Sequence, residues 1–417
     1  MKQKIVVILI LLLTLISCKK EFIFFQQENE NGLPNYGNVD VENVFTAEDS
    51  QLQDKQNVVN TIQQYYDKVW EKGDLSGGFL VAKGDKILFE SYRGFAKENN
   101  QVPINKDVPL HIASISKSLT AMAVLKLVEA RKINLHDKVT HYFPKFPYKE
   151  VEVIHLLNHR SGLPKYEYFI EKLGLKPKNK YFTNQEVLDL LIQHKPDLAR
   201  NTNTGFMYCN TNYALLALIV EKVTAHPFPL AMQKIVFKPL GMEHTYIFQQ
   251  KDSLRAAQSF YYQGNRLYPT DKLDGIYGDK NCYTTPRDLF KFSKAMYAEN
   301  FLRKSLKDSI FTPYSNERRG VNNYGLGFRM KVFDNGEKLT FHNGWWHGSN
   351  TAFVHLQKSK VTIIALGNKF SRRVYSALTL SSLFEDFPLE REKLNKLMNK
   401  ETDTTKENHD AAAESTE

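Results

Sequence analysis

Cysteine is scarce in this sequence, which has 417 residues and only three cysteines, Cys18, Cys209 and Cys282. Cys18 follows an apolar leader (below), so the remaining pair permits at most one disulfide, which excludes a small disulfide-stapled scaffold. The chain also has no zinc-finger spacing and no RNA-binding aromatic signature. A formal net charge of +10 is therefore better explained by a basic, solvated surface that favours anionic neighbours than by nucleic-acid binding.

Apolar residues are abundant. Hydrophobic residues make up 42% of the chain and aromatic residues 12%, which is too apolar for a disordered protein and ample for a large core. Length alone suggests two or three folding units. We find no internal repeat that would indicate a solenoid or propeller.

The N-terminus predicts export. Lys2 and Lys4 are followed by "IVVILILLLTLIS", which is short for a membrane span and typical of a secretory signal. The run ends in Leu-Ile-Ser-Cys18, which resembles the lipobox of bacterial lipoproteins. We therefore expect a signal peptide at 1–17, lipidation of Cys18, a polar tether at 18–54 and anchoring to the periplasmic or outer face of the bacterial cell envelope. A plain signal peptide or a short membrane anchor is the alternative.

The remainder predicts a domain at 55–392, followed by a charged, disordered tail at 393–417. Helical spacing begins at 55, and "GGFLVAKGDKILFESYRGFA" predicts a hairpin that turns at Gly84-Asp85. Residues 116–271 are helical in pattern, most clearly at 119–130, 185–193 and 213–223. Short strands follow 320, and an amphipathic helix is expected at roughly 373–398. The layout favours an α/β (α+β) fold, in which 55–115 and 272–392 build one part and a helical part is inserted between them.

The stretch "HIASISKSLTAMAVLKLVEA" places Ser114 three residues before Lys117, so the two would share one face of a helix. At the first turn, free N–H groups and the helix dipole favour a developing anion. A serine there is equally the ordinary N-cap residue. The Ser-x-x-Lys pattern also arises easily by chance, because Ser17 and Lys20 match it in the leader. Ser114 is a candidate nucleophile only if other segments supply a proton acceptor.

Two segments could do so, "TGFMYCNTNYALLALIVEKV" and "LTFHNGWWHGSNTAFVHL". With them, the chain resembles the class C β-lactamase and D-Ala-D-Ala peptidase superfamily of serine hydrolases, whose elements read S-x-x-K, Y-x-N and K/H-x-G. The matching residues, in order, are Ser114 and Lys117, Tyr208 and Asn210, and His342 and Gly344. Further phrases also resemble the family: "LHDKVTHYFPKFP", "HLLNHRSGLP", "KPLGMEHTYI", "TTPRDLFKFSKAM" and "YGLGF". The resemblance spans roughly 55–390 and implies a β-lactamase/transpeptidase-like fold, an antiparallel sheet flanked by helices with an inserted all-helical domain.

The resemblance also implies roles. Ser114 would form the acyl-enzyme, and Lys117 and Tyr208 would handle its proton, with the choice of base left open because the pair is coupled. Asn210 would bond the acyl side chain of the substrate and help to hold Lys117. The strand with His342 and Gly344 would form the other wall of the site. The backbone N–H groups of Ser114 and Trp345 would form the oxyanion hole. No metal or cofactor is implied.

The sequence departs from the family at the last motif. His342 stands where β-lactamases often have lysine, and a mostly neutral histidine offers a hydrogen bond in place of a permanent cation. This weakens the β-lactamase interpretation and leaves a peptidase or esterase. Trp345 and Trp346 stand where small residues are usual. We expect at least one of them to face the substrate, the alternative being that an indole packs in the core.

Other candidates have simpler explanations. His155 and His159 are four apart on an expected helix, but no H-E-x-x-H pattern supports a metal. The Cys209 thiol is expected to point into packing. Arg372 and Arg373 could meet an anionic substrate, but a solvated helix start is the preferred interpretation.

The leading hypothesis is a membrane-anchored serine hydrolase that forms an acyl-enzyme with an ester, amide or D-amino peptide. The alternatives are a class C-like β-lactamase and a penicillin- or peptidoglycan-binding protein without turnover. The sequence leaves open the acyl substrate, hydrolysis against transfer, and the oligomeric state.

Overall fold

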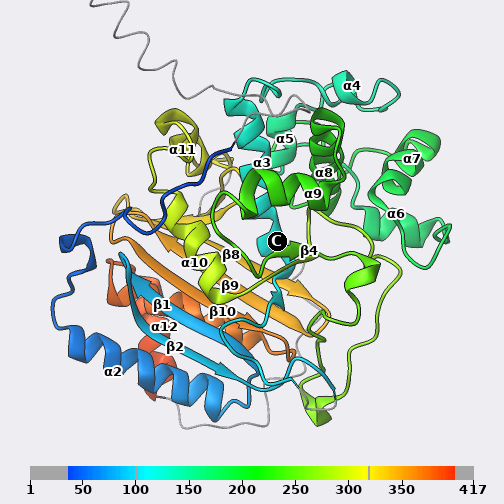
Figure 1. The fold of residues 1–417 in the computed structure, drawn as a ribbon. Coiled ribbons are helices and arrows are strands. Elements are labelled where there is room, and N and C mark those ends of the chain that lie inside the picture. Colours follow the sequence, from blue (N-terminus) through cyan, green and yellow to red (C-terminus); the bar gives the residue numbers. More distant parts are fainter. Residues whose placement is uncertain (1–35, 99–101, 318–319, 400–417) are drawn as a thin grey trace, which may run out of the picture. The chain divides into compact units, whose positions relative to one another are not determined.

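A seven-stranded antiparallel sheet is built from both ends of the chain, in the order β2-β1-β10-β9-β8-β7-β6 (Figure 1). The computed structural model describes residues 36–98, 102–317 and 320–399. Strands from before residue 94 and after residue 322 pair directly, with Phe79 opposite Ala365. The strands are β1 (Gly77–Lys83), β2 (Lys86–Arg93), β6 (Asn322–Tyr324), β7 (Arg329–Val332), β8 (Lys338–Trp346), β9 (Ser349–Leu356) and β10 (Val361–Gly367).

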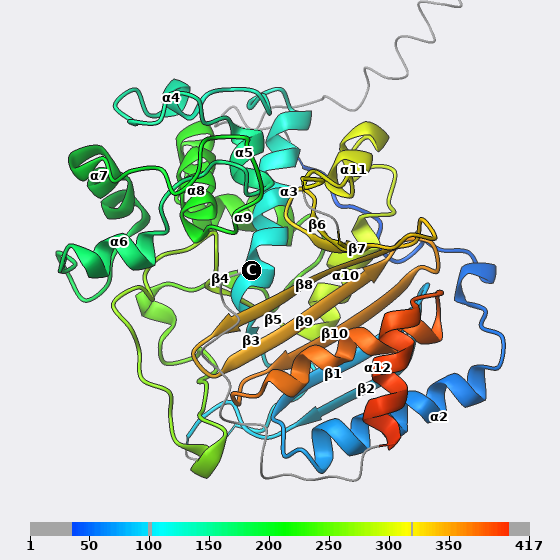
Figure 2. The ribbon, with the colours of Figure 1, turned by 180° about the vertical axis from the view of Figure 1, so that it is seen from behind.

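One face of this sheet is covered by three helical segments that also come from both ends of the chain (Figure 2). They are α2 (Lys55–Tyr66), which continues into η2 (Asp67–Glu71), together with η7 (Arg372–Leu383) and α12 (Pro388–Asn399). Alternate side chains of β1, Phe79 and Val81, point into this layer beside the fully buried Trp70. Burial of these large apolar side chains stabilises the pairing of the two chain ends, at about 1.5–3 kcal/mol for each fully buried one.

Helix α10 (Pro286–Ala295) and the long helix α3 (Ser116–Glu129) lie on the other side. Every residue of α3 from Ser116 to Val128 is buried, as its nearly all-round apolar sequence predicts. Helix α3 packs against α8 of the helical region (Figure 1). The helical region holds α4 (Val139–Tyr142), α5 (Val153–Leu157), α6 (Tyr166–Lys172), α7 (Asn184–His194), α8 (Asn210–Thr224), α9 (Phe228–Met232), η4 (Gln233–Phe237), η5 (Gln250–Asp252) and η6 (Gln263–Asn265). The short helix α11 (Lys304–Ile310) follows α10 and precedes β6.

The fold class predicted from the sequence is confirmed: an antiparallel sheet flanked by helices, with a helical region between its halves. The hairpin turns at Gly84-Asp85, and helices lie where the three clearest patterns predicted them. The region 116–271 is not purely helical, because β4 (Tyr246–Ile247) pairs with β5 (Cys282–Thr284), which also pairs with β3 (Leu110–His111).

The prediction of one helix over 373–398 is wrong. The chain forms the 3-10 helix η7, breaks, and restarts as α12 at Pro388. Proline lacks the N–H that would continue a helix, and it disfavours helical geometry at Phe387 before it. Helix α12 reaches Asn399, so residues 393–399 are helical and not part of a disordered tail. Residues 400–417 lie outside the described residues.

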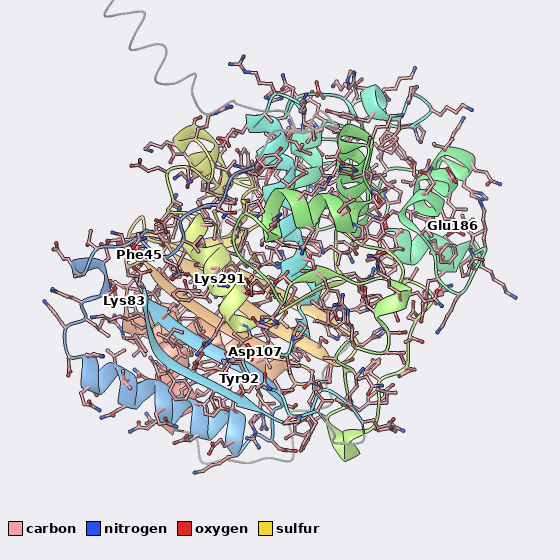
Figure 3. The ribbon with its side chains drawn as sticks, in the orientation of Figure 1. Phe45, Lys83, Tyr92, Asp107, Glu186 and Lys291 are labelled. Carbon is pink, nitrogen blue, oxygen red and sulfur yellow. The ribbon has the colours of Figure 1, made fainter. Side chains whose placement is uncertain are left out.

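The segment expected as a tether makes contacts with the domain from Val39 onward. Val39 and Val41 are buried, and the Val39 N–H donates to the Pro239 carbonyl over 2.8 Å. The ring of Phe45, which Figure 3 labels, packs edge-on against Tyr297 at 4.8 Å between centroids. The expected signal peptide and Cys18 lie outside the described residues. Within the described ranges no single helix is long and apolar enough to cross a membrane, and one bent pair, Asn210–Thr224 with Phe228–Phe237, meets that requirement jointly.

Candidate active site

Ser114 lies in a short 3-10 turn, η3 (Ala113–Ile115), directly before α3 and not within the first turn of the helix itself. Ala113 has a φ of +47°, a left-handed conformation that a residue with a Cβ adopts at a cost of order 1–3 kcal/mol. The turn is tied to its surroundings through Ile112, whose N–H donates to the Cys282 carbonyl over 3.0 Å. The strained geometry is thus held by its neighbours and fixes the direction of the Ser114 side chain.

Lys117 is completely buried, and its ammonium is directed at the serine. Its Nζ donates to Ser114 Oγ over 3.0 Å and to the Asp279 carbonyl oxygen over 2.8 Å. It also lies 5.0 Å from the centroid of the Tyr208 ring. The structure therefore brings together Ser114, Lys117 and Tyr208, three residues from two segments that are nearly a hundred residues apart.

Tyr208 precedes α8 and stands among aromatic and basic groups. Its ring centroid lies 4.4 Å from that of His159 and 6.4 Å from that of His342. The Arg329 guanidinium carbon lies over the ring, 4.7 Å from its centroid. The Tyr208 ring thus has two cationic groups, Lys117 and Arg329, within about 5 Å of its centroid.

Asn210 differs from the expectation drawn from the resemblance. Its Nδ2 donates to the carboxylate of Glu167, and its Oδ1 is buried without a hydrogen-bond partner. Lys117 therefore receives no support from Asn210, and the Asp279 carbonyl holds the ammonium instead. The atom of Asn210 that could accept from Lys117 is Oδ1, and it is left unpaired because the amide is oriented by its Nδ2 bond to Glu167.

His342 is buried, and both its ring nitrogens are engaged by the protein. Nδ1 lies 2.7 Å from the Asn343 carbonyl oxygen and Nε2 lies 3.1 Å from the Tyr324 hydroxyl. Burial, with Arg329 and Lys117 adding to it, lowers the pKa of His342 well below its usual value. The ring is therefore neutral, with its proton on Nδ1 and Nε2 as acceptor. Because both ring nitrogens are hydrogen-bonded within the protein, the His342 side chain presents no free polar group to a substrate.

Gly344 lets strand β8 approach the turn that carries Ser114. A Cβ at this position would lie 2.3 Å from Thr351 Oγ1 and 2.5 Å from the Ile112 carbonyl oxygen, so only glycine fits. The Gly344 carbonyl accepts a 3.0 Å hydrogen bond from the Tyr375 hydroxyl. In a trans peptide the next N–H points the opposite way, so the Trp345 N–H is directed away from Tyr375.

The two indoles have different surroundings. Trp345 is 47% exposed and meets the Phe370 ring edge-on at 6.4 Å. Trp346 is half-buried, and its Nε1 donates to Asp274 over 2.8 Å. The indole of Trp345 is also hydrogen-bonded, through Nε1 to the His347 carbonyl over 3.1 Å, but its exposed ring can contact a ligand, whereas Trp346 is held against Asp274.

A buried polar cluster beside Lys117 was not found from the sequence. The Tyr166 hydroxyl donates to Asp279 Oδ2 over 2.6 Å, and the Lys280 ammonium donates to the Tyr166 oxygen over 2.5 Å and lies 3.3 Å from that carboxylate. Burial and the Asp279 charge raise the pKa of Tyr166 well above its usual value, so the hydroxyl keeps its proton. None of the three family motifs includes Tyr166, Asp279 or Lys280. Asp-Lys pairs also occur elsewhere in the chain, for example at 271–272, so the sequence offers no signal for this cluster.

The remaining candidates are structural. His159 lies beyond the end of α5, with a φ of +57°, and its Nδ1 accepts from the Cys209 N–H over 3.2 Å. No group of three or more metal-binding side chains occurs among the described residues. Cys209 is buried, with its thiol 3.3 Å from the Leu163 carbonyl, which confirms the packing interpretation. Arg372 begins η7 and is exposed, as a solvated helix start predicts.

A serine with a buried lysine partner on the central helix, beside an antiparallel sheet, defines the class of protein: a serine hydrolase of the β-lactamase and D-Ala-D-Ala peptidase type. The Beta-lactamase family model matches residues 62–380, and the chain belongs to that family. Penicillin-binding protein 4* of Bacillus subtilis is 30% identical over 344 residues, which is 79% of this chain and 76% of that protein.

Solved structures agree on the fold. A penicillin-binding protein from Bacillus halodurans superimposes with a TM-score of 0.66 and 25% identity, covering 80% of this chain and all (100%) of that one. The D-amino acid amidase of Ochrobactrum anthropi SV3, solved with L-phenylalanine amide, gives a TM-score of 0.64 at 22% identity, covering 82% and 99% of the two chains. At that identity the second likeness concerns the fold alone.

Proposed function

We propose that Ser114 is the nucleophile of this hydrolase and that its acyl donor is an ester, an amide or a D-amino peptide. The observation that carries the proposal is the 3.0 Å hydrogen bond between the buried Lys117 ammonium and Ser114 Oγ. A buried lysine with no carboxylate partner for its ammonium is costly, and a structural role alone would not require it.

In the proposed reaction the proton of Ser114 passes to the coupled pair Lys117 and Tyr208 as Oγ attacks the carbonyl carbon. The N–H groups of Ser114 and Trp345 stabilise the oxyanion. The same pair returns the proton to the leaving group, whose departure leaves the acyl-enzyme. Water, or an amine acceptor, then attacks the ester carbon and gives a proton to the pair. The pair returns that proton to Ser114 Oγ as the acyl–oxygen bond breaks, which restores the free serine.

Hydrolysis of peptides or esters is favoured over β-lactamase activity by His342. The side chain is neutral and both nitrogens are satisfied, so the first position of this motif supplies no permanent cation for a β-lactam carboxylate. The relative named at 30% identity is a penicillin-binding protein, which supports a peptidase-like acyl donor.

We also propose that the protein is a lipoprotein, held on the cell envelope through Cys18. The lipobox-like sequence supports this. Metabolic labelling with a palmitate analogue, compared between wild type and Cys18→Ala, tests it. Labelling that persists in the variant would contradict the proposal.

The nucleophile is tested by the intact mass of a soluble form that begins after Cys18, incubated with a penicillin, for wild type and Ser114→Ala. A stable adduct on wild type alone supports a peptidase-like site with slow deacylation. Consumed penicillin without an adduct favours a β-lactamase, and intact penicillin favours an esterase or amidase. An adduct on both forms would refute Ser114 as nucleophile. If wild type keeps its adduct and turns over no ester or amide, the protein is a binding protein.

A further inference from the structure

Several buried polar atoms near the reaction centre have no hydrogen-bond partner within the described part of the chain, and two of them belong to Glu167 and Asn210, whose side chains are hydrogen-bonded to each other. Glu167, on α6, accepts from Asn210 Nδ2 through Oε1, while its Oε2 has no partner. Asn210 Oδ1 is also without a partner. Both oxygens are buried, and leaving a buried acceptor unsatisfied costs roughly 1–3 kcal/mol, more where it is charged. Two unsatisfied acceptors on side chains that are hydrogen-bonded to each other indicate a ligand that brings hydrogen-bond donors.

These acceptors are connected to Ser114 through Tyr208 and Lys117. Asn210 follows Tyr208 by two residues, and the Tyr208 ring lies 5.0 Å from Lys117 Nζ. Glu167 and Asn210 each remain partly exposed. Because rotation about the last bond of a carboxylate or amide side chain is soft, a small rotation can present either oxygen to a ligand bound at Ser114.

The balance of charges around Glu167 is compatible with a bound cation. Burial, with the nearby Asp279 carboxylate, raises the pKa of Glu167, and Lys280 opposes this. Lys280 is itself engaged by Tyr166 and Asp279. Lys280 is thus paired with the Asp279 carboxylate, and Glu167 has no salt-bridge partner among the described residues, so a ligand cation can pair with it. A bound ammonium would hold the Glu167 carboxylate in its charged form.

The donor is also restricted by what Asn210 offers. Its Nδ2 is already used by Glu167, so the side chain presents a carbonyl oxygen and no N–H. A substrate with an acylated amine keeps a single N–H and carries no charge there, so it can satisfy only one of the two acceptors. A substrate with a free amine would direct N–H groups at them.

We infer that Glu167 and Asn210 bind the free amino group of the acyl donor, so that the substrates are aminoacyl amides, esters or peptides with an unblocked N-terminus. The ammonium donates to Glu167 Oε2 and Asn210 Oδ1 while the aminoacyl carbonyl lies at Ser114. This inference rests on the proposed function, because it concerns the acyl side of the same site.

The test compares D-alanine p-nitroanilide with N-acetyl-D-alanine p-nitroanilide on wild type, Glu167→Gln and Glu171→Gln. Wild type should prefer the free amine in kcat/KM by about ten- to a hundredfold, the range expected for a charged hydrogen bond. In Glu167→Gln this ratio should collapse toward one, chiefly through KM for the free amine. Glu171 is exposed on the same helix, and Glu171→Gln should keep the wild-type ratio.

A wild-type preference for the acetylated substrate, or an unchanged ratio in Glu167→Gln, would overturn the inference. Reaction with a fluorophosphonate probe distinguishes failure of the ammonium site from failure of Ser114 as the nucleophile. Labelling of wild type but not Ser114→Ala, together with no preference for the free amine, would refute the ammonium site alone. Absence of labelling would refute the nucleophile as well.

Discussion

Thr351, on β9, donates from Oγ1 to the Ile112 carbonyl oxygen over 2.9 Å, and so ties the central sheet to the turn that carries Ser114. The contact is possible because Gly344, on the neighbouring strand, leaves space for both groups. The distance between the nucleophile and strand β8 is thus set by backbone contacts that no longer side chain would permit.

Gly344→Ala should therefore damage both stability and catalysis. The added methyl group forces β8 away from Ile112, which we expect to cost about 1–3 kcal/mol of unfolding free energy and to displace the Trp345 N–H. Denaturant unfolding and kcat for an ester substrate measure the two effects. Gly336→Ala is the matched control: its φ of +81° makes alanine strained, but no atom lies within 4 Å of the new Cβ. Equal losses of kcat in the two variants would contradict this account.

Lys117→Met should remove proton transfer while filling the same buried space. We expect the rate of Ser114 acylation to fall by about a hundredfold or more, the usual contribution of general acid–base catalysis. Stopped-flow acylation by an activated ester measures this rate. Lys126→Met is the control, since Lys126 is buried on the same helix but donates to the Phe301 carbonyl. An acylation rate within a few-fold of wild type in Lys117→Met would remove Lys117 from the mechanism.

Lys280→Met should destabilise the protein by about 3–5 kcal/mol, because it leaves the buried Asp279 carboxylate without its cation. Guanidinium unfolding measures the loss. The double variant Lys280→Met with Asp279→Asn should recover much of it, since no buried charge then remains. A double variant that is less stable than the single one would show that the pair does not act through charge.

Stability should fall as pH decreases from 7 to 5. Burial penalises the charged form of histidine and lowers the pKa most for four buried ones: His111, to about 4, His355, to about 3, and His159 and His342, well below their usual value. It also lowers the pKa of His155. Below about pH 6.5 the unfolded chain binds protons that the folded chain does not, so each histidine costs about 1.4 kcal/mol per pH unit in that window.

Urea unfolding at pH 7, 6 and 5 measures this dependence. Proton NMR provides an independent check, because these four imidazoles should show no titration above pH 5. A constant unfolding free energy across this range would mean that the histidines are protonated in the folded state, contrary to their burial.

The sequence by itself determined the family, the order of the three motifs and the positions of most helices and strands. Helix α3 was predictable because its apolar residues and the Ser114–Lys117 spacing are local, and the hairpin at Gly84 because turns have local signatures. The break before Pro388 was present in the sequence but was outweighed by amphipathic spacing on both sides.

Tertiary structure alone decided how polar groups pair. Glu167 turns Asn210 away from Lys117, and Asp279 takes its place through a backbone carbonyl, which has no sequence signature. Such contacts join segments far apart in the chain, and their geometry depends on how α3, α6 and α8 pack. Hydrogen bonds are satisfied only at specific distances and angles, so the chemistry of the site follows from the packing and not from the motifs alone.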